Sequence, residues 1–264
     1  MTKFSNKKSL GQNFLTDENI ARKIVESANL SSTDNVLEIG PGEGILTGCL
    51  AESGTHVLAI EIDRNLENIL IKKFPKNRNI KIIFSDILKA NLPKLIEENN
   101  FQNYKVVANL PYYITSKILR LLLETKFPPK EMILMVQKEV GKRIVAQDEK
   151  ESILSISVKF YADPEILFEV PRENFEPAPV VDSAVIRIKR KKDVPEIDIQ
   201  KFFSLVKAGF SAKRKMLANN LSSALSISKD ELSERMQKAG LAPTVRAEKL
   251  KVEDWTKLCK NLVE

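Results

Sequence analysis

Residues 36–44 of the chain read Val-Leu-Glu-Ile-Gly-Pro-Gly-Glu-Gly. This stretch and the segments that follow it indicate the fold. The first four residues are typical of a buried β-strand, and Gly40, Gly42 and Gly44 follow at once. Glycines after a strand allow a tight turn and let a ligand approach the backbone, because no Cβ atom stands in the way. The spacing differs from the G-x-G-x-x-G pattern of dinucleotide-binding proteins. We therefore expect a ligand at this turn and disfavour a nicotinamide-dependent enzyme.

Four more short hydrophobic runs follow, and each precedes a segment with the spacing of an amphipathic helix. The runs are HVLAIEI (56–62), IKIIF (80–84), YKVVANL (104–110) and MILMVQ (132–137). Strands that alternate with helices are typical of a parallel sheet covered by helices. The sequence therefore predicts an α/β fold.

The remainder of the chain divides into two kinds of sequence. Segments 153–161 and 181–189 are predicted to be two further strands, joined by a proline-rich loop and forming an antiparallel hairpin at the sheet edge. After the charged stretch that follows them, every segment has helical spacing. We therefore predict an α/β domain over residues 1–192 and a small all-helical domain over residues 193–264.

Positive charge is concentrated toward the end of the chain. The formal net charge is +7, and residues 191–264 carry fifteen Lys or Arg against ten Asp or Glu. A further basic cluster, Lys3, Lys7 and Lys8, lies at the N-terminus. A basic patch of this kind is typical of proteins with a polyanionic partner, although excess lysine often only keeps a surface soluble.

Composition disfavours several other classes of protein. No run of about eighteen apolar residues could span a bilayer, and the N-terminus has no apolar signal segment, so we expect a cytoplasmic protein without a membrane partner. Cys49 and Cys259 are the only cysteines and His56 is the only histidine. We therefore expect reduced thiols and no metal site.

Carboxylates end the second and third predicted strands. Glu61 stands where it could accept hydrogen bonds from both hydroxyls of a ribose, and Asp86 follows the next strand. Together with the glycine turn, they predict a nucleoside-sized crevice at one sheet edge. Taken singly, such residues more often serve turns and helix caps, and we interpret Asp63 as an N-cap.

The fourth run leads into Asn109, Leu110, Pro111 and Tyr112, a tetrapeptide that resembles the catalytic motif of amino-methyltransferases. An adenine amine is a poor nucleophile because its lone pair is delocalised into the ring. The side-chain oxygen of Asn109 and the carbonyl of Leu110 can accept its two hydrogens, which localises the lone pair for attack on a methyl donor. Pro111 stiffens the turn, and Tyr112 offers a face on which a flipped base could stack. The structural alternative is an Asn-Pro turn with a buried tyrosine.

Three other segments, KKSLGQNFL (7–15), NFEPAPVVDSAVIRI (174–188) and FSAKRKMLANNL (210–221), are similar to stretches of the bacterial small-subunit ribosomal RNA adenine dimethyltransferases. The resemblance extends over essentially the whole chain. It implies a Rossmann-like methyltransferase sheet with S-adenosylmethionine as methyl donor and no metal. The residues that it places against the cofactor are Asn13, Leu15, Gly40, Glu61, Asp86 and Asn109.

The same resemblance matches Phe175 to an aromatic residue that helps hold the target base, although a core phenylalanine is an equally good interpretation. Two positions depart from the family pattern: Tyr113 stands where asparagine is common, and Lys213 where arginine is common. Neither belongs to the cofactor set. These departures therefore leave the substrate less certain than the reaction type.

The resemblance implies action on two adjacent adenines near the 3′ end of 16S rRNA in an assembling ribosomal particle, by a monomer. Lys213, Arg214 and Lys215, in a stretch with helical spacing, are expected to contact RNA phosphates. A solvated helix is the alternative for these charges, as it is for the run at 189–192. Three other functions stay open at this point: methylation of large-subunit rRNA, methylation of a small molecule, and RNA binding without catalysis.

Overall fold

The computed structural model describes residues 12–75 and 79–263. The chain divides into two compact units that each combine two stretches: residues 1–141 with 164–190, and residues 142–163 with 191–264. The basic N-terminal cluster Lys3, Lys7 and Lys8 falls outside the described residues. No helix in the described part of the chain is long and apolar enough to cross a membrane.

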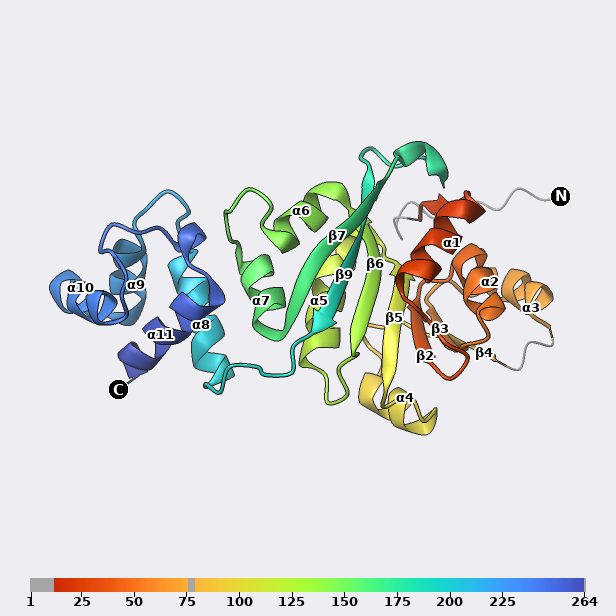
Figure 1. The fold of residues 1–264 in the computed structure, drawn as a ribbon, viewed down its shortest axis with the longest axis horizontal. Coiled ribbons are helices and arrows are strands. Elements are labelled where there is room, and N and C mark those ends of the chain that lie inside the picture. The colour runs from red at the N-terminus through yellow and green to blue at the C-terminus, as the bar shows by residue number, and fades with distance from the viewer. Residues whose placement is uncertain (1–11, 76–78, 264) are drawn as a thin grey trace. The chain divides into compact units, whose positions relative to one another are not determined.

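The first unit is built on a sheet of seven strands: β2 (Asn35–Ile39), β3 (His56–Glu61), β4 (Ile80–Phe84), β5 (Tyr104–Asn109), β6 (Glu131–Gln137), β7 (Ala162–Val170) and β9 (Ser183–Arg190). Their order is β4-β3-β2-β5-β6-β9-β7, as Figure 1 shows. Strands β2 to β6 pair in parallel, whereas β9 runs antiparallel to β6. The predicted α/β fold is therefore confirmed. The strand order reverses between β2 and β5, which is where open parallel sheets bind their ligands.

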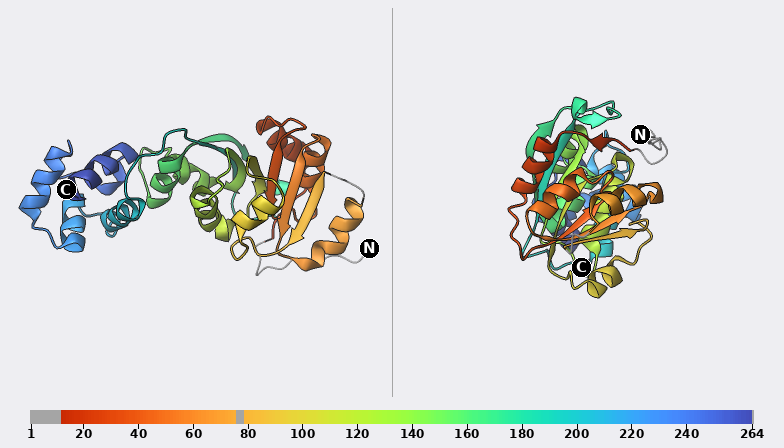
Figure 2. Two further views of the ribbon diagram at one scale, coloured as in Figure 1. Left: turned by 90° about the horizontal axis from the view of Figure 1, so that it is seen from below. Right: turned by 90° about the vertical axis from the view of Figure 1, so that its right-hand side faces the viewer.

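The central strands read as unbroken hydrophobic runs because both of their faces are covered. In β3, every residue after His56 is buried. The helices of this unit are α1 (Glu18–Ser27), α2 (Ile45–Glu52), α3 (Glu67–Lys73), α4 (Leu92–Glu98) and α5 (Thr115–Glu124), with 3-10 turns η2 (Arg64–Leu66), η3 (Tyr112–Ile114) and η4 (Arg172–Asn174). Helices α1 and α2 lie side by side (Figures 1 and 2). Ile24 and Leu50 from these helices share one core with Val57 and Val107 from the sheet.

A second, two-stranded sheet joins two segments that are far apart in the sequence. Strand β1 (Phe14–Leu15) pairs antiparallel with β8 (Phe175–Glu176), so that Leu15 lies opposite Phe175. The backbone N–H and the hydroxyl of Thr16 both donate to the carbonyl oxygen of Asn174, at 2.9 and 3.0 Å. The start of the described chain is thereby tied to the proline-rich loop before β9.

The second unit is helical. Helix α6 (Lys138–Val145) leads into it, followed by α7 (Ile153–Tyr161), α8 (Ile199–Gly209), α9 (Leu217–Leu225), α10 (Lys229–Lys238), the 3-10 turn η5 (Ala247–Lys249) and α11 (Val252–Val263). Its core holds Phe160 and Phe202, whose ring centroids are 4.6 Å apart, and the buried Trp255. A Cβ atom on Gly209 would lie 2.3 Å from the Trp255 ring, so α8 needs a glycine to approach α11 closely.

The sequence-based prediction of a strand over 153–161 is wrong, because this segment forms helix α7. Its alternation of apolar and polar residues resembles a strand. A capping box at Ser152 and Ser155 nonetheless starts a helix, with each side chain bonded to the backbone of the other residue. Ile156 and Phe160 are four residues apart and both fully buried, so they share one face of the helix. The strand β7 begins only at Ala162.

Candidate active site

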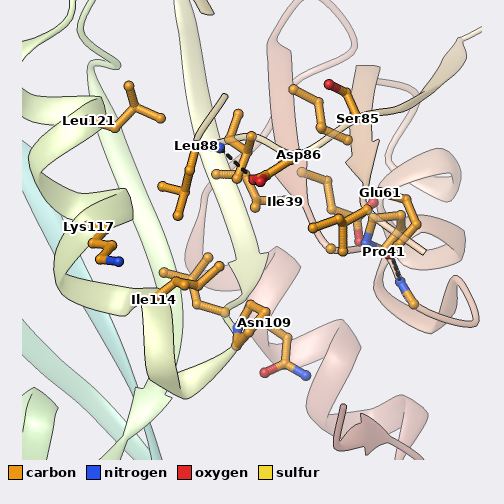
Figure 3. Close-up of a pocket in the computed structure, with 18 of the residues that line it drawn as sticks. Ile39, Pro41, Glu61, Ser85, Asp86, Leu88, Asn109, Ile114, Lys117 and Leu121 are labelled. Atoms are coloured by element: carbon orange, nitrogen blue, oxygen red, sulfur yellow. Dashed lines mark hydrogen bonds between the residues drawn. The ribbon is translucent and has the colours of Figure 1, made fainter. Parts of the chain in front are cut away.

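A cavity of about 1000 Å³ opens at the carboxyl edge of the parallel strands of the first unit (Figure 3). Its lining comes from the ends of β2, β3, β4 and β5, from α5, and from residues 12–15. The register of the parallel strands explains the convergence, because their carboxyl ends meet at one edge. Such a volume is at the upper end of the range for small-molecule sites.

The glycine turn forms one wall of this cavity. Gly40 and Gly42 have φ angles of +71° and +59°, which side chains rarely tolerate. A Cβ atom on Gly42 would lie 2.9 Å from the ring of Phe14, so the first described segment packs directly on the turn. The Gly40 N–H donates to the carbonyl oxygen of Ile60 at 2.9 Å and thereby holds the turn against β3.

Glu61 lies at the end of β3, almost fully buried, and lines the cavity (Figure 3). Its Oε1 accepts the N–H of Asp63 at 2.7 Å and its Oε2 accepts the N–H of Gly42 at 3.1 Å. Burial raises the pKa of this carboxyl, while the backbone hydrogen bonds act in the opposite direction. A carboxylate has about four lone-pair sites, so both oxygens retain capacity to accept a bond from a ligand.

Glu38 is a second buried carboxyl in the cavity lining, one that the sequence analysis did not select. Its Oε2 accepts the hydroxyl of Thr47 at 2.7 Å. Burial, with a smaller contribution from the Glu61 carboxyl, raises its pKa to about 8. The position could have been noticed, because a carboxyl inside an otherwise apolar strand, two residues before Gly40, is unusual for a buried position.

Asp86 follows β4 and also lines the cavity. Its Oδ1 accepts the N–H of Leu88 at 3.0 Å, as Figure 3 shows, and its Oδ2 lies 3.8 Å from the Nζ of Lys89. The N–H of Ser85 donates to the carbonyl oxygen of Glu61 at 2.8 Å. This bond continues the β3–β4 pairing and keeps the two carboxylates on one edge.

The tetrapeptide that starts at Asn109 lies where β5 ends, next to the glycine turn that follows the paired strand β2. Asn109 and Leu110 both line the cavity, and the Leu110 N–H donates to the carbonyl oxygen of Met135 at 3.1 Å. The side-chain nitrogen of Asn109 donates to the carbonyl oxygen of Asn13 at 3.5 Å. Asn13 and Leu15 line the cavity too, so every residue of the cofactor set suggested by the family resemblance borders this one space.

The two aromatic candidates differ in their positions. Tyr112 borders the cavity, and its hydroxyl lies 2.6 Å from the hydroxyl of Ser183. Phe175 is buried in the core beside its strand partner Leu15 and is not part of the cavity lining among the described residues. Its pairing through β8 places it one strand away from the lining segment 12–15.

Asp63 is an N-cap, as expected: its Oδ1 accepts the N–H of Asn65 at 3.2 Å at the start of η2. It has a second role that the sequence did not reveal, because its Oδ2 accepts the side-chain nitrogen of Gln12 at 3.0 Å. This bond holds the first described residue against the β3 side of the cavity.

Lys213, Arg214 and Lys215 belong to the second unit and do not line the cavity. The expectation that they lie in a helix is wrong, since residues 211–216 form a turn between α8 and α9. All three side chains are exposed. In the ranges 12–75 and 79–263, no three His, Cys, Asp or Glu side chains come together in a way that could hold a metal ion.

Comparison with known proteins identifies close relatives over the whole chain. The family model described as "Ribosomal RNA adenine dimethylase" matches residues 3–264. The ribosomal RNA small subunit methyltransferase A of Dehalococcoides mccartyi is 43% identical over 258 residues, which cover 96% of this chain and 87% of that protein.

Two solved structures share the architecture. The 23S rRNA methyltransferase ErmE is 27% identical with a TM-score of 0.75, and the match covers 96% of this chain and all of that one. A dimethyladenosine transferase from Plasmodium falciparum is 25% identical with a TM-score of 0.77, covering 93% and 95% of the two chains.

Proposed function

The chain belongs to the ribosomal RNA adenine dimethylase family, and from that membership we propose that it methylates the exocyclic amines of two adjacent adenines near the 3′ end of 16S rRNA. The product is N6,N6-dimethyladenosine and the methyl donor is S-adenosylmethionine. One observation carries the proposal: Asn109, Leu110 and Tyr112 border the same cavity as the glycine turn and Glu61.

The residues around the cavity suit a nucleoside with a charged tail. Glu61 is fixed by two backbone N–H groups and would accept the ribose hydroxyls. Asp86, which follows the neighbouring strand β4, lines the same cavity and would also contact the cofactor. Gly40 leaves the backbone of the turn open to close approach, and Asn13 and Leu15, from the segment that packs on this turn, would contact the cofactor beside it. When bound, S-adenosylmethionine supplies an electrophilic methyl group.

The chemistry that the chain itself performs is the positioning and polarisation of an amine. The side-chain nitrogen of Asn109 donates to the carbonyl oxygen of Asn13 at 3.5 Å, which leaves its side-chain oxygen to accept a hydrogen from the target amine. That oxygen and the carbonyl of Leu110 accept the two amine hydrogens, so the nitrogen lone pair is localised for in-line attack. Each transfer releases one proton from the amine. After the first transfer, the remaining hydrogen can bond to either acceptor, which permits a second.

Tyr112 provides the surface on which the flipped adenine stacks, and Phe175 helps hold the base indirectly, through its pairing with Leu15 of the cavity lining. In the helical domain, residues 193–264, the exposed Lys213, Arg214 and Lys215 contact RNA phosphates. The enzyme works as a cytoplasmic monomer without a metal, on small-subunit rRNA within an assembling particle.

The test is to incubate the purified protein with S-adenosylmethionine and small subunits from cells that leave these adenines unmodified, and then to measure modified nucleosides by mass spectrometry. Dimethyladenosine at two adjacent positions near the 3′ end of 16S rRNA is expected. Methylation of large-subunit rRNA alone would instead favour the activity named for ErmE. A product that stops at monomethyladenosine would contradict dimethylation, and no methyl transfer to either RNA would contradict the proposal.

A further inference from the structure

Ser183 occupies an unusual place in the sheet. Because β9 is antiparallel to β6, its first residue, and not its last, lies at the edge where the parallel strands end. Ser183 pairs with Gln137, the last residue of β6, and is fully buried. The preceding carbonyl, that of Asp182, accepts the N–H of Lys138 at 3.0 Å. The backbone on both sides of Ser183 is therefore held by the sheet, so the Cβ atom that carries its hydroxyl has a fixed position.

That hydroxyl lies 2.6 Å from the hydroxyl of Tyr112. Tyr112 begins the 3-10 turn η3 after Pro111, and its ring borders the cavity. A tyrosine ring turns about two torsions, and because the hydroxyl oxygen lies on the axis of the second, the bond at its tip fixes the first torsion and so the direction of the ring. The preference of the phenolic O–H for the ring plane then favours one rotation about that axis. Further hydrogen bonds at this turn run from the Thr115 hydroxyl to the carbonyl oxygens of Pro111 and Tyr112, at 3.4 and 3.3 Å, and from the Ile114 N–H to that of Pro111, at 3.2 Å. They hold the backbone and leave the ring direction open. The bond from Ser183 is thus the contact that sets where the ring points.

We propose that Ser183 is a positioning residue, which fixes the ring of Tyr112 as the platform for the target adenine. This proposal rests on the function proposed above. Stacking requires the ring to present its face to the base, and a methyl transfer depends on the alignment of the base nitrogen with the donor methyl. Ser183 touches neither RNA nor cofactor and acts through the tyrosine hydroxyl alone.

A positioning role and ordinary packing predict different kinetic effects of changing Ser183. A serine buried only for stability would contribute to unfolding free energy and leave turnover unchanged. A serine that aims Tyr112 should lower kcat, because the base still enters but is held less well aligned. The KM for RNA should change little, since most of the RNA contact lies in charged groups elsewhere. A neutral hydrogen bond is worth about 0.5–1.5 kcal/mol, which corresponds to a fall in kcat of about two- to thirteenfold.

The test is a double-mutant cycle with Ser183→Ala and Tyr112→Phe, each of which removes one partner of the bond and keeps the backbone. Both single variants should show a similar fall in kcat on undermodified small subunits, and the double variant should be no slower than the slower single one. Ser155→Ala is the matched control. It removes another fully buried, hydrogen-bonded serine, in helix α7 of the second unit, and should leave kcat unchanged.

Calorimetry with S-adenosylmethionine separates the possible failures. Unchanged cofactor affinity in Ser183→Ala, combined with lower kcat and non-additive effects, supports the proposal. Wild-type kcat in Ser183→Ala, or a fall in kcat that is undiminished in the Tyr112→Phe background, overturns it. Loss of cofactor affinity in Ser183→Ala also overturns it, because the serine then supports the whole site. A wild-type protein that binds no cofactor and transfers no methyl group refutes the proposed function itself, and this inference with it.

Discussion

Replacing Glu38 with glutamine should stabilise the protein, by an amount that grows as the pH rises. In the folded protein, burial raises the pKa of Glu38 from 4.5 to about 8. Between these two values the folded state holds a proton that the unfolded state has released. The wild-type protein therefore loses stability as the pH rises through this window, whereas a glutamine at this position has no proton to lose.

The magnitude follows from the size of the window. One proton of difference corresponds to about 1.4 kcal/mol of unfolding free energy per pH unit. From pH 5.5 to 7.5, the difference in unfolding free energy between Glu38→Gln and the wild type should thus grow by at most about 2.5 kcal/mol. Glutamine retains an oxygen for the Thr47 hydroxyl, so packing and that hydrogen bond are kept. The charged neighbours that influence Glu38, the Glu61 carboxylate and Lys73, are present in both proteins.

The assay is urea unfolding followed by far-UV circular dichroism at pH 5.5, 6.5 and 7.5, at constant ionic strength. The difference between variant and wild type removes the pH dependence of the groups that do not interact with Glu38. Glu26→Gln, on the exposed face of α1, is the control and is measured at the same three pH values. A Glu38→Gln advantage that stays constant over the three pH values would refute the reasoning, because Glu38 would then ionise equally in both states.

Three further predictions concern the proposed reaction. Asn109→Ala should lose most methyl transfer while folding normally, because its amide polarises the amine only in the transition state; substantial turnover at saturating cofactor would contradict this. Glu61→Ala should weaken S-adenosylmethionine binding by about ten- to a hundredfold in calorimetry, since two ribose hydroxyls lose their acceptor, and wild-type affinity would remove Glu61 from the site. Changing Lys213, Arg214 and Lys215 to alanine should flatten the log-affinity against log-salt slope for small-subunit RNA by about 0.7–0.9 per lost contact, with cofactor affinity unchanged. An unchanged slope would exclude them as the phosphate contact.

The sequence predicted the part of the site that depends on strand ends. Glu61, Asp86 and Asn109 could be placed at one edge because each closes or follows a hydrophobic run, and parallel strands bring such ends together. The glycine turn was visible for the same local reason. These inferences need only the order of elements along the chain, which periodicity provides.

Two local predictions failed because tertiary packing outweighs residue pattern. Segment 153–161 alternates like a strand, yet the cap at Ser152 and the burial of Phe160 among the aromatic rings of α8 favour a helix. Residues 211–216 have helical spacing, yet they form a turn. The side chain of Asn220 donates to the carbonyl oxygens of Gly209 and Ala212, at 2.6 and 3.1 Å, and so satisfies carbonyls where α8 ends.

The contacts between segments that are distant in the sequence could not be predicted. These contacts connect the proposed cofactor turn with the strand proposed to support the target base. Asp63 caps η2, which its sequence context indicates, but its bond to Gln12 depends on where the first described residues lie. That bond holds a segment whose next ring, Phe14, packs on Gly42, and whose strand β1 pairs with Phe175 in β8. The same short segment therefore contacts the turn proposed to hold the cofactor and the strand proposed to support the target base. A change at Asp63 should therefore disturb both the proposed cofactor turn and the strand proposed to support the target base. A residue that only capped a helix would have neither effect.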